Sequence, residues 1–115
     1  MKKFLLSFTF AFKGLGYAYR TQLNFKVHTF AALLAITLGV IYKISSQEWV
    51  WILLAIGLVL ISELLNTALE VLVDLVSPGF HPKAGAVKDV SAAAVLVMAF
   101  LAVLIGLIVF VPKVF

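Results

Sequence analysis

Four polar side chains interrupt the apolar segment "ELLNTALEVLVD" at residues 63–74: Glu63, Asn66, Glu70 and Asp74. At about 100° per residue on a helix, they fall within one arc of about 80° and form a stripe about 16 Å long. Carboxylates on one face can hold a divalent cation through hard oxygen ligands or act as a general base. Pairing with Lys or Arg elsewhere is the alternative. We favour pairing for Asp74 alone, and chemistry for the set of Glu63, Asn66 and Glu70.

The composition predicts a membrane protein. The 115 residues are 64% hydrophobic and only 12% charged, with a mean hydropathy of +1.19. A soluble domain of this size could not bury so much apolar surface, whereas a bilayer can solvate it. The chain has no cysteine, which excludes disulfides and Cys-zinc sites, and its net charge of +4 is too small and scattered to predict a nucleic-acid partner.

Three segments are apolar enough to span a bilayer, at about residues 28–44, 49–76 and 89–111. Short polar connections separate them, and the second connection, residues 77–88, contains the helix breakers Pro78, Gly79, Pro82 and Gly85. The expected fold is therefore one all-α integral membrane domain over residues 1–115.

Residues 2–26 predict a different kind of helix. Phe4, Phe8, Phe12 and Leu15 fall on one face of this segment, and Lys2, Thr9, Lys13, Gly16 and Arg20 lie opposite them. Such a pattern is typical of an amphipathic helix on the membrane surface. A cleaved signal peptide is the alternative, although no A-x-A cleavage site follows the apolar run.

The basic residues predict the orientation. With a cytoplasmic N-terminus and an external C-terminus, seven basic residues lie inside and two outside. The inside group is Lys2, Lys3, Lys13, Arg20, Lys26, Lys83 and Lys88.

The second span is too long for the bilayer alone. Its 28 residues would extend about 42 Å, against a hydrocarbon core of about 30 Å. The stripe should therefore begin at the cytoplasmic edge of the hydrocarbon and end in the headgroups. Because carboxylates that face lipid are costly, the stripe should face protein or a wet cleft.

Lys88 and Asp89 open the third span on the same side as Asp74. Lys88 is suited to a phosphate, and Asp89 could cap the helix or complete a cation site. An interfacial charge pair is the alternative for both. His28 and His81 lack metal-ligand spacing, and we interpret each as an isolated polar group at the interface.

Two segments, "ELLNTALEVLVD" (63–74) and "FHPKAGAVKDVSAAAVLV" (80–97), closely resemble the signature of the prokaryotic diacylglycerol kinases, which include undecaprenol kinases. The segment "FAFKGLGYAYRTQLNFKVH" (10–28) resembles the N-terminal helix of that family. The matching positions are Glu63, Asn66, Thr67, Ala68, Glu70, Asp74, His81, Lys88 and Asp89.

The resemblance implies a homotrimeric lipid kinase of the bacterial cytoplasmic membrane. It would use ATP and Mg²⁺ to phosphorylate a lipid alcohol, diacylglycerol or alternatively undecaprenol, at the cytoplasmic interface. The implied general base is Glu63, with Asn66 orienting the groups around it and Glu70 holding the metal. The residues implied to face the nucleotide, or in part the lipid, are Asp74, His81, Lys88, Asp89, Lys13, Gly14 and Arg20.

One position departs from the family pattern. Gln22 stands where the family often has a second metal-binding Glu, so a neutral amide would have to serve as the ligand. Two other hypotheses use the same stripe: a non-enzymatic oligomeric membrane protein, and an ion or proton carrier with buried carboxylates.

Overall fold

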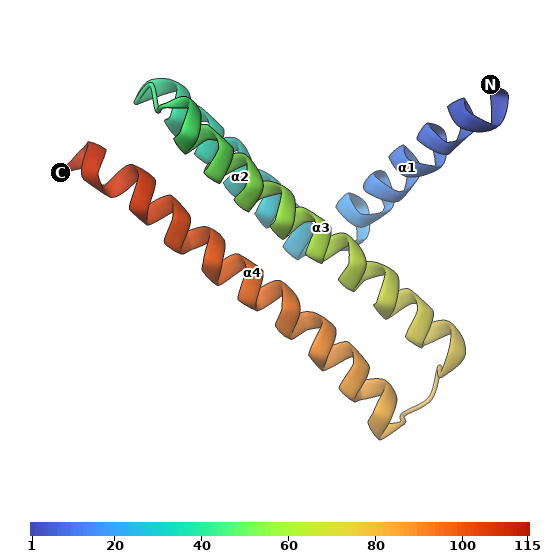
Figure 1. Ribbon diagram of the computed structural model, residues 1–115. Helices are drawn as coiled ribbons and strands as arrows, with labels where there is room; N and C mark the ends of the chain where they lie inside the picture. Colours follow the sequence, from blue (N-terminus) through green and yellow to red (C-terminus); the bar gives the residue numbers. More distant parts are fainter.

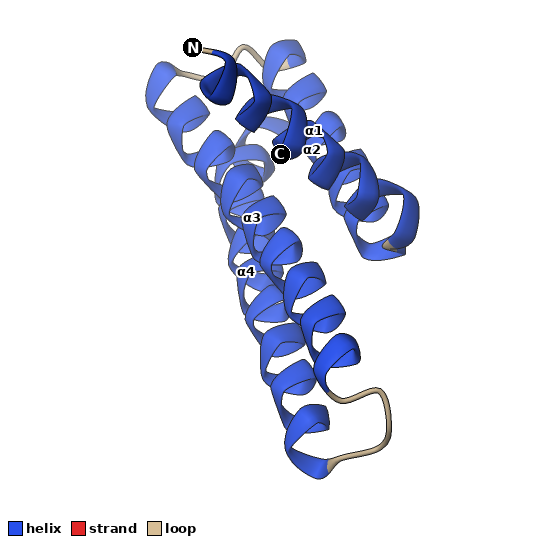
Figure 2. Cartoon of the chain, turned by 90° about the vertical axis from the view of Figure 1, so that its right-hand side faces the viewer, coloured by secondary structure: helices blue, strands red, loops and turns tan.

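The structure, a computed structural model of residues 1–115, consists of four helices and no strand (Figures 1 and 2). They are α1 (Lys2–Thr21), α2 (Leu23–Ile41), α3 (Ser46–Val76) and α4 (Pro82–Val114). α2 and α3 form an antiparallel pair, and α4 returns along the length of α3. α1 projects away from the other three helices and meets them at its C-terminal end (Figure 1). The predicted all-α class is confirmed.

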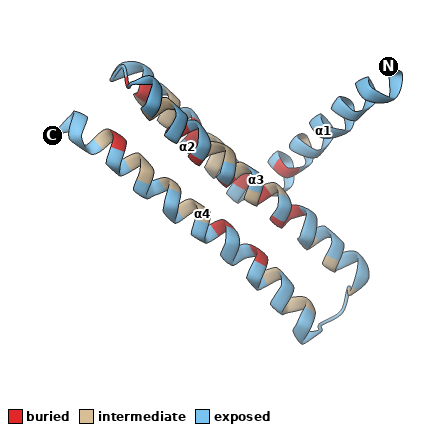
Figure 3. Cartoon of the chain, in the orientation of Figure 1, coloured by how far each residue is buried: buried red, intermediate tan, exposed pale blue.

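Three of the helices, α2, α3 and α4, are long and apolar enough to cross a membrane. Only 14 of the 115 residues are buried (Figure 3), and large apolar side chains are exposed along all four helices. This amount of exposed apolar area needs lipid or a partner to cover it. The chain is therefore a membrane protein.

The break between α1 and α2 lies at Gln22. Its backbone is extended, with φ −115° and ψ 111°, and its N–H bonds to the carbonyl of Ala18. The first helix thus ends at Thr21, before the predicted residue 26, and α2 begins at Leu23, before the predicted residue 28. No glycine or proline marks this break in the sequence, which explains the difference.

Close packing shapes the connection between α2 and α3. Gly39 is buried, and a Cβ at this position would lie 2.6 Å from the indole of Trp49, so only glycine fits without movement of the ring. Ser45 then caps α3: its hydroxyl accepts from the N–H of Glu48, and the Glu48 carboxylate accepts from the N–H of Ser45. This reciprocal capping box satisfies two backbone donors at the helix start.

α4 begins earlier than the third span was expected to. Pro82 occupies the first turn, where its missing N–H is not needed, and the His81 Nδ1 accepts from the N–H of Lys83 as the cap. The alternative that Asp89 caps this helix is therefore wrong, because Asp89 lies inside α4. At the other end of α4, Lys113 Nζ lies 3.2 Å from the Glu48 carboxylate and ties α4 to the start of α3.

Candidate active site

One face of α3 is buried along most of its length. Its first half is apolar, with Ile52, Ala55 and Val59, and its second half is polar, with Glu63 and Asn66. These positions recur at three- and four-residue intervals, so they share one side of the helix. The first two residues of the polar stripe, Glu63 and Asn66, thus point into the protein and continue an apolar face.

Glu63 is the most deeply buried large side chain of the molecule, with 0% of its surface exposed. Neither carboxylate oxygen has a hydrogen-bond partner. The side chain lies where α2 packs against α3, and the Nε2 of His28 is 3.9 Å from the Glu63 Oε2. A buried carboxylate without hydrogen bonds is costly to fold, and it marks a place where a ligand can supply them.

Asn66 and Glu70 form the next part of the stripe. The Asn66 Nδ2 donates to the Glu70 Oε1 over 3.2 Å, whereas the Asn66 Oδ1 is buried without a partner. Asn66 also lines a cleft between α3 and α4, together with the buried Ser91. Glu70 is half-buried. The amide therefore orients one carboxylate and keeps one acceptor free.

Asp74 forms an ion pair with Lys88, which is the interpretation that the sequence favoured for this residue. Lys88 Nζ lies 2.5 Å from the Asp74 Oδ1; the Asp74 side chain is largely exposed, and that of Lys88 is half-exposed. His81 lines the same small pocket at the α3–α4 connection. For Lys88 the charge-pair alternative is thus observed, while Asp89 is exposed.

The basic residues of α1 form a separate group. Lys13, Gly14 and Arg20 line an open depression that is made by α1 alone. Gly14 also faces a cleft shared with α3, whose other lining residues are mostly apolar. One chain therefore does not bring Lys13 and Arg20 together with Glu70.

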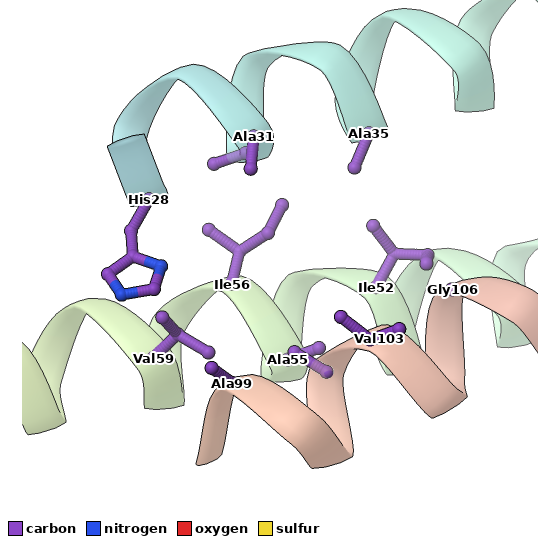
Figure 4. A pocket seen from close by; sticks show the side chains of 12 residues that line it. His28, Ala31, Ala35, Ile52, Ala55, Ile56, Val59, Ala99, Val103 and Gly106 are labelled. Carbon is purple, nitrogen blue, oxygen red and sulfur yellow. The ribbon is translucent and has the colours of Figure 1, made fainter. Parts of the chain in front are cut away.

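An apolar cavity of about 220 Å³ lies between α2, α3 and α4 (Figure 4). Alanines of α2 and α4 and the apolar half of the α3 face line it, with Gly106 at one end and His28 at the other. Val59 belongs to this lining and lies one helical turn from Glu63. The cavity is thus apolar along its length and ends beside the buried carboxylate.

The residues present fit a magnesium ion that would be held in part by substrate phosphates. No group of three or more His, Cys, Asp or Glu side chains converges within the chain. Mg²⁺ commonly uses only one or two carboxylates, with waters and substrate phosphates completing its shell. The Glu70 carboxylate, next to the unpartnered Asn66 Oδ1, supplies hard oxygen atoms of this type.

The sequence model described as prokaryotic diacylglycerol kinase matches residues 9–110. The chain belongs to the prokaryotic diacylglycerol kinase family. This confirms the resemblance inferred from the two signature segments. As a member of this family the chain is a lipid kinase, and membership implies ATP as the phosphate donor.

Three curated relatives illustrate the range of the family. An undecaprenol kinase of Bacillus subtilis is 42% identical over 113 residues, which cover 98% of this chain and 92% of the relative. A diacylglycerol kinase of Synechocystis sp. is 43% identical over 89% of this chain, but this region is only 59% of the relative. A diacylglycerol kinase of Escherichia coli is 32% identical over 83% of this chain and 78% of the relative.

His28 is the residue of this site that the sequence did not predict. We interpreted it as an isolated interfacial group, whereas the structure places it on α2 against Glu63 of α3. The register of α2 against α3 brings the two side chains together, and no spacing within either segment encodes that register.

Proposed function

We propose that the protein transfers the γ-phosphate of ATP to the hydroxyl of a membrane lipid alcohol. The observation that carries this proposal is the buried, unpartnered carboxylate of Glu63 at the end of an apolar cavity. An amphiphile with one terminal hydroxyl complements this arrangement: the hydrocarbon lies against alanine and isoleucine, and the hydroxyl meets the base.

In this mechanism Glu63 is the general base. It accepts the proton as the O–H bond of the lipid breaks, a bond forms from the lipid oxygen to the γ-phosphorus, and ADP leaves with the bridging oxygen. Asn66 orients the groups around the base. Phosphoryl transfer depends mainly on positioning and on neutralised charge, so few side chains are needed.

The nucleotide is assigned to the polar end of the stripe. Glu70, assisted by Gln22 at the α1–α2 break, would hold Mg²⁺, which when bound neutralises charge on the phosphates. Lys88 is half-exposed and has donors beyond the one that meets Asp74, so it can contact a phosphate. The other residues assigned to the nucleotide are Asp74, His81, Asp89, Lys13, Gly14 and Arg20.

The assembly proposed is a homotrimer in the bacterial cytoplasmic membrane. α1 lies on the membrane surface, with the N-terminus in the cytoplasm and the C-terminus outside, so that seven of nine basic residues are cytoplasmic. A neighbouring subunit would bring its α1 depression, with Lys13 and Arg20, to the Glu70 end of the stripe, which one chain alone does not achieve.

Two acceptors are candidates. Diacylglycerol, giving phosphatidic acid, is supported by the Synechocystis sp. and Escherichia coli relatives. Undecaprenol, giving undecaprenyl phosphate, is supported by the Bacillus subtilis relative, because that similarity covers nearly the full length of both chains. Full-length similarity leads us to place undecaprenol first.

The test is incubation of the purified protein in micelles with labelled ATP, Mg²⁺ and each alcohol separately, with Glu63→Gln as the matched control. We expect labelled product on undecaprenol, less on diacylglycerol, and almost none with the variant. Faster labelling of diacylglycerol would reverse the order of acceptors. Labelling of neither alcohol would contradict the proposed function and favour an assembly protein or a carrier.

A further inference from the structure

His28 is the one basic side chain within 4.0 Å of Glu63. The carboxylate is fully buried, while 19% of the His28 side chain remains exposed. The other polar neighbours of Glu63, Asn66 and Glu70, lie on α3 itself and are bonded to each other. From the other helices, therefore, only His28 is placed to fix the direction of the carboxylate.

The contact is specific at the level of atoms. The separation between the imidazole Nε2 and Oε2 is 3.9 Å, and neither carboxylate oxygen has a hydrogen-bond partner. A separation of 3.9 Å is longer than a hydrogen bond, but contacts of catalytic bases often shorten only when substrate is bound.

We propose that His28 is a positioning residue for Glu63. Its Nε2–H donates to Oε2 when the acceptor binds, which fixes the plane of the carboxylate and leaves Oε1 to accept the proton of the lipid hydroxyl. A base that is itself oriented by a third group is a recurrent arrangement in enzymes that activate a hydroxyl. This inference rests on the proposed function of Glu63 as the base.

The apolar cavity supports this assignment. His28 lines the cavity at the end nearest Glu63, and it is the only polar residue among its twelve lining residues (Figure 4). A hydrocarbon chain in the cavity would therefore leave it beside the imidazole, and the hydroxyl would arrive next to the carboxylate that His28 holds.

The test uses substitutions of similar size that differ in hydrogen bonding. His28→Leu fills the site without a donor, whereas His28→Gln places an amide N–H near the position of Nε2. We expect His28→Leu to lower kcat on the order of 10- to 100-fold, the loss typical of one hydrogen bond to a charged group, with KM for ATP unchanged. We expect His28→Gln to remain within about threefold of wild type, because its amide replaces that bond.

Two controls keep the result decisive. Thr29→Val changes the next residue of α2, whose hydroxyl bonds only to the Phe25 carbonyl, and it should leave kcat unchanged. If His28→Leu fails to fold, His28→Asn replaces it as the donor-free variant, because its shorter amide cannot reach Oε2. The kcat of His28→Asn should then fall by the same factor as expected for His28→Leu.

Wild-type kcat in the folded His28→Leu variant, or in His28→Asn where leucine fails to fold, would overturn the inference. Equal kcat losses in His28→Gln and in the folded donor-free variant would also overturn it. A wild-type protein that phosphorylates neither alcohol would instead contradict the proposed function, so the two failures are distinguishable.

Discussion

Two carboxylates of α3, Glu48 and Glu63, lie in opposite environments. Glu48, in the first turn, accepts from the N–H of Ser45 over 2.9 Å and lies 3.2 Å from Lys113. Glu63, fifteen positions further along the same helix, is fully buried and has no hydrogen bond at either oxygen. The first carboxylate completes a helix start and joins two helices, so its role is structural. The second contributes nothing of this kind to the folded chain.

The difference separates stability from function within one element. Burying a polar group without a partner disfavours folding, and sites that do so are commonly ligand or catalytic sites. Glu63 is of this type, whereas Glu48 and Asp74 are satisfied by basic side chains. Substitutions at the Glu48 capping box and at the Glu63 site should therefore separate into those that affect stability and those that affect turnover.

Glu63→Gln should have the largest effect. Loss of a general base lowers kcat by about 10²- to 10⁴-fold, whereas removal of an unpaired buried charge should leave the folded protein as stable or more stable. The measurements are kcat on the preferred alcohol and the thermal midpoint in detergent. A variant that keeps its turnover but loses its folded state would place Glu63 with the structural carboxylates and would contradict the comparison.

Glu70→Gln should have the next largest effect, through the metal. With one carboxylate ligand fewer, the concentration of Mg²⁺ that gives half-maximal activity should rise at least about tenfold, by analogy with losses at metal sites. Activity should recover at high Mg²⁺. Glu48→Gln is the matched control in the other half of α3, and it should leave the Mg²⁺ dependence unchanged. An equal shift in both variants would indicate that Glu70 is not a metal ligand.

Much of this architecture could be predicted from the sequence. Long apolar segments determine α2, α3 and α4, and helical periodicity places Glu63 and Asn66 on one buried face. Helix ends that no glycine or proline marks could not be predicted in this way. The break at Gln22 carries no glycine or proline, so the first helix was predicted to be too long.

The site was predictable only in part for a related reason. The stripe lies within one helix, where spacing gives position, but the contact between His28 and Glu63 joins two helices. Its existence depends on the register of α2 against α3, which follows from packing such as that of Gly39 against Trp49. The pairing of Asp74 with Lys88 could be predicted from the sequence, because the short connection between α3 and α4 brings both residues to the same end of the two helices.

Lys88→Met should have a smaller effect than either acidic variant. We expect KM for ATP to rise about tenfold through loss of one charged phosphate contact, with a modest change in kcat. Asp74→Asn removes the partner of Lys88 and keeps the Lys88 charge, and an exposed ion pair contributes about 0–1 kcal/mol to stability. If Lys88→Met and Asp74→Asn give the same kinetic constants, Lys88 serves the ion pair and does not bind the nucleotide.

Ser45→Ala should have the smallest effect on catalysis and a measurable effect on folding. The Ser45 hydroxyl accepts from the N–H of Glu48 in the capping box, and loss of such a cap destabilises a helix start by about 1 kcal/mol. Thermal unfolding in detergent should therefore show a lower midpoint, while kcat and KM remain those of the wild type. Because Ser45 and Glu63 lie on the same helix, this variant and Glu63→Gln should show opposite responses: one loses stability and keeps turnover, and the other loses turnover and keeps stability. A Ser45→Ala protein with lowered kcat would show that the two halves of α3 are coupled, and the division of roles along this helix would then be wrong.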